Sequence, residues 1–537
     1  MESWRDGIWR QLAQPWDMIV VGGGITGAGV LREATRAGLR VLLLEQRDFA
    51  WGTSSRSSKL VHGGLRYLKE GKIALTRASV RERERLIGEA PGLIDPLGFL
   101  LPTYEGDHPG RWTYRAGLTV YDLLALHWSH QHYNVADFQM LLPRLSPDGL
   151  EGGFRYGDAQ TDDARLVLRV IHEAVAAGGT ALNYAAVEDL LREAGKVAGV
   201  RIRDTVADKS IVLRAPVVVN ATGAWADRLT GENKLPGKIR PLRGSHLIFP
   251  FWRLRVPQAV SFLHPIDRRP VFVFPWEGVT VVGTTDVDHD RPLDEEPRIS
   301  AEECAYLMAA VEARFPSLAI TLDDVQASFA GVRPVVSSGE TDPSKESRDH
   351  VVIEDQGLVT VTGGKLTTFR LIALDAINAV RHSLPSVRKL DDRTPVLDPV
   401  DQELPGCAHL SDSVRRRLLG RHGKDAARLV GCASRDELKP LPGTLALWAE
   451  LRWAARSEWV VHLEDLLLRR VRLGLLLRQA GREVMPEIRA ICQPELLWDD
   501  ARWESEEAAY VDLCRTRYSL PDRASIPDWK EMLRGSR

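Results

Sequence analysis

Residues 17–47, DMIVVGGGITGAGVLREATRAGLRVLLLEQR, decide the fold of this chain. A short apolar strand, Met18–Val21, runs into a G-x-G-x-x-G motif at 22–27. A helix-like segment follows, and a second strand, Val41–Leu44, ends at an acidic residue. Strand, glycine turn, helix, strand and terminal acid stand in the order of a dinucleotide-binding βαβ unit. The stretch therefore predicts a Rossmann-like nucleotide-binding domain in an α/β protein.

Each glycine of the motif has a physical role. Gly22 permits a tight turn, Gly24 lets the backbone approach a pyrophosphate, and Gly27 lets the helix pack closely on the strand. The N-terminus of the helix offers N–H groups and a positive dipole end to phosphate. Glu45, at the tip of the second strand, can accept both hydroxyls of an adenosine ribose. The motif alone leaves NAD and FAD as alternatives.

Composition and charge are those of an ordinary globular protein. The chain has 537 residues, which predicts two or three domains, and a formal net charge of −2, which gives nucleic acid no general attraction. Five scattered cysteines without C-x-x-C spacing indicate reduced thiols, so neither a disulfide framework nor a metal site is expected. We therefore predict a cytoplasmic protein.

The sequence also limits how the protein can associate with a membrane. The chain begins without a signal-peptide pattern, and it has no run of about 18 apolar residues that would span a membrane. Trp4, Trp9 and Trp16 lie close to arginines near the N-terminus, as in an interfacial anchor. A short segment packed against the protein body is the favoured interpretation. Peripheral contact with the inner face of the cytoplasmic membrane is not excluded.

Periodicity along the chain predicts the remaining organisation. Helices are expected at 72–90 and 163–177, and strand-rich runs at 246–250 and 271–286 indicate a mixed sheet in a second lobe. After about 390 a proline-containing linker gives way to helical periodicity. The prediction is a cofactor-binding region 1–390, with cofactor segments at about 17–85, 150–240 and 325–385 and substrate-cap segments at about 86–150 and 240–325, followed by an all-α domain at 391–537.

Three further segments carry groups suited to a flavin. Thr53 to Lys59 is rich in hydroxyls and continues into VHGGLRY at 61–67, which suits a diphosphate and an isoalloxazine edge. The buried strand at 217–220 ends in a small-residue turn that can approach a nucleotide. The turn GGKLTT at 363–368 opens a helix whose N–H groups can hold negative charge. Because the chain has a single G-x-G-x-x-G motif, a separate nicotinamide domain is not indicated.

These segments together resemble the FAD-dependent, respiratory-type glycerol-3-phosphate dehydrogenases, within the D-amino-acid-oxidase-like flavoproteins. The resemblance covers most of the chain in family order, less closely at 405–455. Its motifs are GGGITGAG, TSSRSSKLVHGGLRYL, DDARLVL (162–168), VVNATGAWAD, GSH (244–246), FVFPW (272–276), VVGTTD (281–286), GVRP (331–334), SRDH (347–350), GGKLTTFR and EWVVHLEDLLLRRVRLGL (458–475).

The resemblance implies an FAD domain, a mixed-sheet cap and a helical C-terminal domain. It implies oxidation of sn-glycerol 3-phosphate to dihydroxyacetone phosphate, with electrons passed to a membrane quinone; a homodimer is compatible with it. The residues implied to bind FAD are Gly22, Gly24, Ile25, Thr26, Gly27, Glu45, Gln46, Thr53, Ser54, Ser55, Ser58, Lys59, Leu60, His62, Gly63, Val187, Thr222, Gly223, Gly364, Lys365 and Leu366. Those implied to bind substrate are Arg66, Tyr67, His246, Arg333, Arg348 and Lys365.

The chemistry of the substrate agrees with this set. A phosphate dianion needs several converging cations, and arginine binds its oxygens bidentately. Oxidation of a secondary alcohol moves a hydride from C2 to flavin N5 while a base takes the hydroxyl proton. Histidine suits the base, and the sequence leaves His62 and His246 as alternatives. Catalytic roles are thus expected for His62, His246, Arg333 and Lys365.

Three other functions stay open at this point. An oxidase would use the same scaffold and pass its electrons to molecular oxygen. A flavin-binding sensor without turnover would be expected to lack the cationic set, which is intact. A related flavoenzyme acting on amino or hydroxy acids would need fewer cations for a carboxylate.

Overall fold

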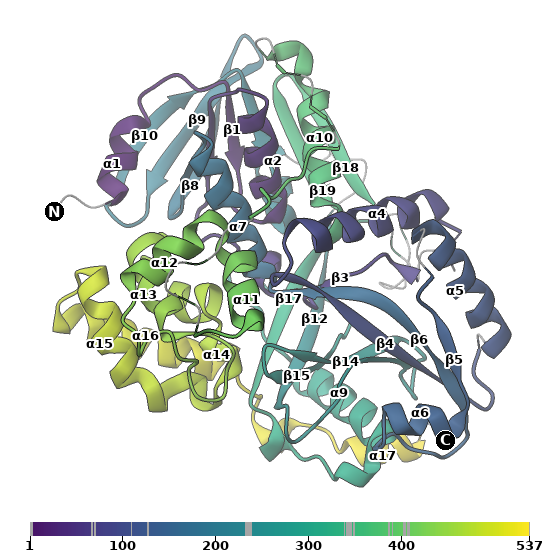
Figure 1. Ribbon diagram of the computed structural model, residues 1–537. Coiled ribbons are helices and arrows are strands. Elements are labelled where there is room, and N and C mark those ends of the chain that lie inside the picture. The colour runs from purple at the N-terminus through teal and green to yellow at the C-terminus, as the bar shows by residue number, and fades with distance from the viewer. Residues whose placement is uncertain are drawn as a thin grey trace.

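The computed structural model describes residues 4–65, 68, 71–108, 110–125, 128–230, 239–337, 339, 346, 349–384, 387–388, 390–391, 393–400, 404, 407 and 409–535. Figure 1 shows a Rossmann-like sheet with its helices, a second lobe built on a larger sheet, and a group of helices beside both. The predicted fold class is therefore confirmed. Three predicted substrate residues, Arg66, Tyr67 and Arg348, lie outside the described residues.

The first lobe contains a six-stranded sheet in the order β18-β19-β11-β1-β2-β7. Its strands are β1 (Met18–Val21), β2 (Val41–Leu44), β7 (Thr180–Leu182), β11 (Val217–Asn220), β18 (His350–Asp355) and β19 (Leu358–Gly363). All neighbouring strands are parallel except β18, which is antiparallel to β19. The predicted strands at 18–21, 41–44 and 217–220 are thus adjacent in this sheet.

Alternate residues of the central strands enter two different cores. Val20 and Leu43 join the core under α2 (Ile25–Arg36), α7 (Asp163–Ala176) and α10 (Phe369–Ala379). Ile19 and Leu42 enter the core on the opposite face, under a three-stranded sheet of β8 (Ala185–Glu193), β9 (Lys196–Asp204) and β10 (Lys209–Arg214). Because side chains alternate along a strand, a sheet covered on both faces needs continuous apolar strands, as these are.

The N-terminal segment packs against the protein body, as favoured from the sequence. It forms α1 (Trp4–Gln11), whose Arg5 is buried in an ion pair of 2.7 Å with Asp204 at the end of β9. Trp16 is buried in the core between the six-stranded sheet and the three-stranded sheet.

The second lobe is built on a ten-stranded mixed sheet. Its strands are β3 (Leu60–Val61), β4 (Ile94–Tyr104), β5 (Gln131–Tyr133), β6 (Leu150–Thr161), β12 (Ile239–Pro250), β13 (Ala259–Leu263), β14 (Pro270–Trp276), β15 (Val279–Gly283), β16 (Val287–Asp288) and β17 (Ala327–Val336). β3, β6 and β17 belong to segments that the sequence analysis groups with the cofactor region, and strand pairing joins them to this sheet.

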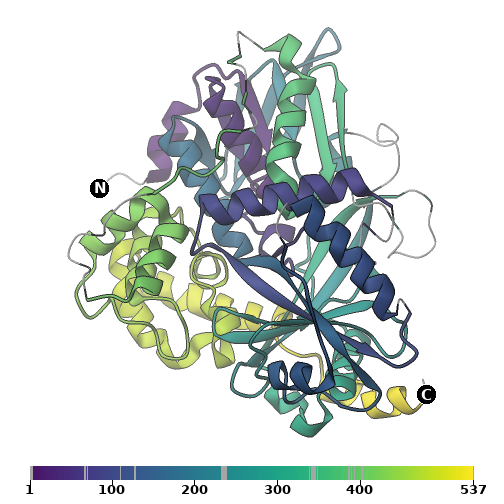
Figure 2. The same cartoon turned by 45° about the vertical axis from the view of Figure 1, so that its right-hand side comes forward.

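Helices cover both faces of the cap sheet. α4 (Ile73–Glu89) and α5 (Arg111–Ala125) pack on one face, and α6 (Val135–Leu141) and α9 (Ala301–Arg314) on the other. Figure 2 shows α4 crossing between the cap sheet and the Rossmann-like lobe. α8 (Ala226–Thr230) lies at the end of β11 in the first lobe.

The C-terminal region is helical, as predicted. It comprises α11 (Asp412–His422), α12 (Ala426–Cys432), α13 (Trp448–Ser457), a π-helical turn (Asp465–Arg470), α14 (Leu473–Leu476), α15 (Met485–Leu496), α16 (Asp500–Arg517) and α17 (Trp529–Gly535). Its apolar residues share one hydrophobic core with the cap sheet. Trp503 of α16 belongs to the same core as Phe274 and Trp276 of β14. The last helix, α17, packs on α9 of the cap.

The segment predicted as a linker is held firmly against the first lobe. Val396 and Leu397 are fully buried, and Arg32 of α2 donates to the Val396 carbonyl at 3.0 Å. The basic run 415–417, at the start of α11, also makes intramolecular ion pairs. Arg416 pairs with Asp95 at 2.7 Å, and Arg417 pairs with Glu277 at 3.0 Å.

Candidate functional site

A cavity of about 360 Å³ opens at the carboxyl ends of the parallel strands. Ligands of open α/β sheets bind at this edge. The predicted residues that line it are Gly22, Gly24, Ile25, Thr26, Glu45, Gln46, Thr53, Ser54, Val187, Thr222, Gly223, Gly364, Lys365 and Leu366. Segments far apart in the sequence thus meet at one site.

The glycine turn has the geometry that its sequence predicts. Gly22 has a φ of +110°, which side chains rarely adopt. A Cβ on Gly27 would lie 1.9 Å from the Gly22 carbonyl oxygen, so no side chain fits there. Ser54 Oγ accepts a hydrogen bond from the Ile25 N–H at 3.0 Å, which joins the hydroxyl-rich loop to the start of α2.

Glu45 is fixed at the tip of β2. Its carboxylate accepts hydrogen bonds from the Gly23 N–H at 2.7 Å and from the Arg47 N–H at 2.8 Å. Burial raises the pKa of Glu45 above its ordinary value, and these two hydrogen bonds oppose that effect. The side chain lines the cavity, in position to accept from a ribose.

The opposite end of the cavity is formed by two more glycine turns. Gly223, after β11, has a φ of +61°, and Gly363 and Gly364, after β19, have φ values of +76° and +83°. The cavity thus extends along the edge of the sheet from β19, past β11, β1 and β2, to β8, which follows β7. Neighbouring strands are about 4.8 Å apart, so the four spacings from β19 to β7 amount to about 19 Å. Such a cavity, with a carboxylate at one end and glycine turns along it, fits an extended dinucleotide.

Sequence reasoning missed several lining residues, of which two tryptophans are the largest. Trp51 and Trp225 both line the cavity, with ring centroids 5.9 Å apart. Trp51 stands two positions before Thr53, and Trp225 stands two positions after Gly223. A bulky aromatic residue close to a predicted cofactor turn is therefore the signal that could have indicated them. The others are Val21, Gly52, Ser57, Ala185, Glu188, Ala221, Ala224, Arg228, Leu229, Pro334, Val361, Thr362 and Gly363.

Seven predicted cofactor residues are not part of the cavity lining: Gly27, Ser55, Ser58, Lys59, Leu60, His62 and Gly63. Lys59 is fully buried and donates to the Ser55 carbonyl at 3.1 Å and to Asp163 at 3.0 Å. Burial and the nearby Arg472 lower the pKa of Lys59 to about 8, against the attraction of Asp163. Lys59 therefore supports the loop from inside.

The turn at His62 and Gly63 is held by buried polar groups. Asp158 accepts from the Gly63 N–H at 2.9 Å and from Arg83 at 2.7 Å. A Cβ on Gly63 would lie 2.3 Å from the hydroxyl of Tyr121, so the position is closed to larger residues. The His62 carbonyl accepts from Thr367 at 3.2 Å, which brings this turn beside the GGKLTT turn.

His246 lies on β12 with its imidazole buried between β15 and β17. Its Nε2 is 3.0 Å from Ser58 Oγ, and the ring stacks on Phe329 with centroids 4.5 Å apart. Its Nδ1 has no hydrogen-bond partner among the residues that the structure describes. Burial, together with the charges of Lys59 and Arg333, holds the pKa of His246 well below its ordinary value.

Of the two predicted cations Arg333 and Lys365, Lys365 lines the cavity and Arg333 does not. Arg333, on β17, pairs with Asp286 at 3.0 Å and donates to Thr284 Oγ1 at 3.3 Å, and its side chain is 26% exposed. The next residue, Pro334, lines the cavity, as does Lys365. Lys365 Nζ lies 3.5 Å from Ser79 Oγ of α4. The structure thus brings Ser58, Lys59, His246 and Arg333 together and places Lys365 on the cavity wall.

Comparisons with known proteins agree with this architecture. Residues 17–370 match the profile of the FAD dependent oxidoreductase family, and residues 386–503 match the C-terminal domain of alpha-glycerophosphate oxidase.

Two sequence relatives and one solved structure are similar over much of the chain. The aerobic glycerol-3-phosphate dehydrogenase of Bacillus subtilis is 41% identical over 69% of this chain and 67% of its own length. Glycerol-3-phosphate dehydrogenase 2 of Mycobacterium tuberculosis is 34% identical over 98% of this chain and 93% of its own. The crystal structure of the Bacillus halodurans glycerol-3-phosphate dehydrogenase complexed with FAD is 28% identical, covers 95% of this chain and 97% of its own, and has a TM-score of 0.76.

Proposed function

The chain belongs to the FAD-dependent glycerol-3-phosphate dehydrogenase family, and we propose that it oxidises sn-glycerol 3-phosphate to dihydroxyacetone phosphate and passes the electrons to a quinone. FAD is its cofactor. The proposal is supported by Lys365 on the wall of the cofactor cavity and by Arg333, whose charge helps to lower the pKa of the buried His246.

Arg333 is suited to a phosphate because it is oriented but not enclosed. Asp286 and Thr284 contact its two terminal nitrogens, and about a quarter of the side chain stays exposed, at 26%. A guanidinium held in this way can add a phosphate oxygen without reorganising, which reduces the entropy lost on binding. Lys365 supplies a second positive charge from the turn after β19.

His246 is the favoured proton acceptor. Because its pKa is depressed, the imidazole is neutral at pH 7 and can take a proton from the substrate hydroxyl. Ser58 fixes the orientation of the ring through Nε2. His62 stays an alternative, and comparison of His246→Gln with His62→Gln tests both. Bound FAD supplies the two-electron acceptor to which the C2 hydride passes.

The proposal is tested on the purified protein by its visible spectrum. A flavoprotein is yellow, and addition of glycerol 3-phosphate without oxygen is expected to bleach the flavin within seconds. Glycerol and lactate are matched controls, since one lacks the phosphate and the other carries a carboxylate. Bleaching by lactate but not by glycerol 3-phosphate would overturn the proposed substrate.

The electron acceptor has one specific alternative. The C-terminal region matches a domain named for alpha-glycerophosphate oxidase, which favours molecular oxygen as a second candidate. Peroxide formed in proportion to substrate oxidised in air would support the oxidase. Rapid reoxidation of the reduced flavin by a soluble quinone, with little peroxide in air, would support the dehydrogenase.

One surface helix supports peripheral contact with a membrane. Trp112 and Leu123 of α5 are each 69% exposed, and Val120 between them is also exposed on the same helix. Arg111 and Arg115 lie over the Trp112 ring, at 5.3 and 5.9 Å from its centroid, so an apolar face carries cations beside it. This combination suits an anionic lipid surface. Among the described residues, no helix is long and apolar enough to span a bilayer.

Sedimentation with anionic vesicles tests this surface. We expect Trp112→Ser with Leu123→Ser to reduce the bound fraction and leave soluble quinone reductase activity unchanged. Trp252→Ser is a matched control, because Trp252 is similarly exposed at 68% outside α5. Equal binding by all variants would remove α5 as the membrane contact.

A further inference from the structure

We propose that the C-terminal helical region sets the affinity for FAD, because it clamps the back of the loop that forms one wall of the cofactor cavity. This loop, residues 48–59, is called the cofactor loop below. The inference rests on FAD binding and not on the identity of the substrate, so it can stand if the proposed reaction fails.

The cofactor loop has two faces with different neighbours. Its front residues Trp51, Gly52, Thr53, Ser54 and Ser57 line the cavity. Its back residues Asp48, Ser55, Arg56 and Lys59 are buried. Apart from a three-residue 3₁₀ turn at Thr53–Ser55, the loop has no regular structure of its own. Its conformation therefore depends on contacts with the surrounding protein.

The first clamp holds Asp48 between two arginines of the π-helical turn. Arg469 Nε donates to Asp48 at 2.5 Å, and Arg470 donates to both carboxylate oxygens at 2.5 and 2.7 Å. All three side chains are at most 1% exposed. Bidentate pairs of this kind fix direction as well as distance.

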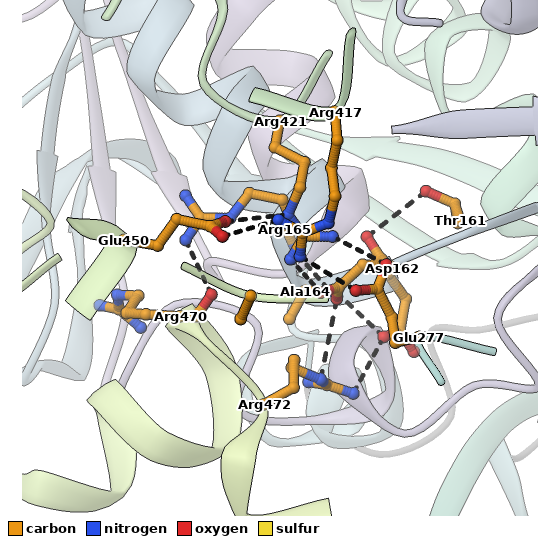
Figure 3. A network of polar contacts seen from close by, with 12 residues as sticks. Thr161, Asp162, Ala164, Arg165, Glu277, Arg417, Arg421, Glu450, Arg470 and Arg472 are labelled. Atoms are coloured by element: carbon orange, nitrogen blue, oxygen red, sulfur yellow. Dashed lines mark hydrogen bonds and ion pairs between the residues drawn. The ribbon is translucent and has the colours of Figure 1, made fainter. Parts of the chain in front are cut away.

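The second clamp holds the backbone of the loop. Arg472 donates to the Ser55 carbonyl at 2.7 Å and to Asp163 at 3.2 Å. Asp163 in turn accepts from Lys59 and from the Ser57 N–H, which lies on the cavity side. Arg472 thus contacts the loop directly at Ser55. It also acts on Ser57 and Lys59 through the carboxylate of Asp163. Figure 3 shows Arg472, which immediately precedes α14, pointing towards Asp162 at the start of α7.

The third clamp joins all three parts of the molecule. Arg56 of the cofactor loop, Glu296 of the cap and Tyr518 of the C-terminal region form a buried triad. Arg56 also donates to the Trp51 carbonyl at 2.5 Å and lies over the Trp51 ring, 4.9 Å from its centroid. Tyr518 therefore acts on a cavity-lining tryptophan through a single arginine.

These clamps order the loop before the cofactor arrives. A loop that is loose in the free protein must lose conformational entropy when it binds, and that loss weakens affinity. Asp48, Ser55 and Arg56 are instead fixed by partners that lie more than 400 residues away in the chain. Arg472 and Tyr518 are thus positioning residues for FAD, although neither lines its cavity.

The test compares two buried tyrosines of the C-terminal region. Tyr518→Phe removes the hydroxyl shared with Arg56 and Glu296, whereas Tyr510→Phe removes a hydroxyl that donates to the Ala480 carbonyl at 2.8 Å within the same region. Flavin fluorescence titration of each apoprotein measures the FAD dissociation constant. We expect Tyr518→Phe to raise it by about three- to tenfold, and Tyr510→Phe to leave it unchanged.

A second pair keeps the inference testable if Tyr518→Phe does not fold. Arg472→Lys retains the charge but loses the fork that reaches Ser55, and Arg452→Lys alters a comparable arginine that pairs with Glu437 and Glu495 inside the C-terminal region. Hydrogen exchange of the loop amides in apoprotein should accelerate in Arg472→Lys and not in Arg452→Lys. The inference would be overturned if Tyr518→Phe and Arg472→Lys both bound FAD with wild-type affinity. It would also be overturned if the controls Tyr510→Phe and Arg452→Lys lost as much affinity as these two variants.

Discussion

The cofactor cavity and the interface of the C-terminal region both bring distant parts of the chain together. The first is formed mainly by backbone turns and the second mainly by charged side chains. The cavity is built from backbone turns at Gly22, Gly223 and Gly364, which leave space for a ligand. The interface is built from long charged side chains that satisfy one another, as in the network of Asp162, Arg421 and Glu450 (Figure 3). A concentration of arginine therefore marks a binding site only where the guanidinium stays open to solvent.

The exposed fraction of individual arginines makes this distinction. Arg469 and Arg470 are at most 1% exposed and donate to Asp48, whereas the side chain of Arg333 is 26% exposed. Burial alone would raise the pKa of Asp48, but Arg470 and Arg469 lower it below its ordinary value. The interface charges thus stabilise the fold, whereas the partly exposed Arg333 is the proposed contact for the phosphate.

The largest effect is expected from a side chain placed in the glycine turn. In Gly27→Val the new Cβ would lie 1.9 Å from the Gly22 carbonyl oxygen, so the turn cannot form beside β1. We expect purified Gly27→Val to contain no FAD, as measured by absorbance at the flavin band. Gly88→Ala is the matched control, because a Cβ at this exposed helical position meets nothing within 4 Å. Full flavin content in Gly27→Val would contradict the turn geometry.

The interface is tested by removing the charge that two arginines share. Asp48→Asn leaves Arg469 and Arg470 buried without their full counter-charge, and such losses cost about 3–5 kcal/mol of stability. The midpoint of urea unfolding should therefore fall markedly. Asp436→Asn, which disrupts a pair with Lys439 on the surface, should leave the midpoint unchanged. Equal midpoints for wild type and Asp48→Asn would show that the pairing contributes little.

The open arginine is tested by enzyme kinetics. Arg333→Ala should raise KM for glycerol 3-phosphate by about 100-fold, because a charge-assisted contact with the phosphate is lost, while flavin content stays intact. Arg253→Ala is a control of similar exposure, 23% against 26%, in the same lobe. Arg253 likewise pairs with an aspartate, Asp324, and its other contacts are the carbonyls of Leu318 and Ala319. Unchanged kinetics in a flavin-replete Arg333→Ala would remove Arg333 from the substrate site.

A smaller effect is expected from pH on the interface histidine His172. Burial lowers its pKa to about 4, despite the attraction of Glu458 and Asp425, so the folded protein keeps it neutral where the unfolded chain binds a proton. Stability should then decrease as pH falls from 6.5 towards 4, by about 1–2 kcal/mol at pH 5.5. His462, whose pKa is raised, acts in the opposite direction. Thermal unfolding of wild type and His172→Gln between pH 7 and 5 measures the difference, and parallel curves would contradict it.

The sequence predicted those parts of the site that depend on local backbone geometry. Gly22, Glu45, Thr222 and Gly364 could be placed because each follows a strand of a parallel sheet, and such ends meet at one edge. The burial of Lys59 could not be predicted in this way, because a polar residue in a hydroxyl-rich loop gives no sign of which face it occupies. Its position depends on Asp163, whose side chain lies within 3.0 Å.

Long-range pairing is the part that the sequence could not supply. Asp48 and Arg470 are separated by 422 positions, and neither residue has a local pattern that names its partner. Likewise, periodicity predicted helices at the C-terminus but not that α17 would pack on α9. Such contacts follow from the docking of whole elements, which single-sequence patterns do not encode.

The packing of α17 on α9 also bears on how the protein is made. Ile526 and Trp529 complete an apolar core that begins with Leu100 and includes Met308. While the chain grows on the ribosome, that part of the cap stays uncovered until residues 526–529 have been translated. Exposed apolar surface promotes aggregation during this time. During biosynthesis the cap is thus exposed to aggregation in the interval before residues 526–529 are added.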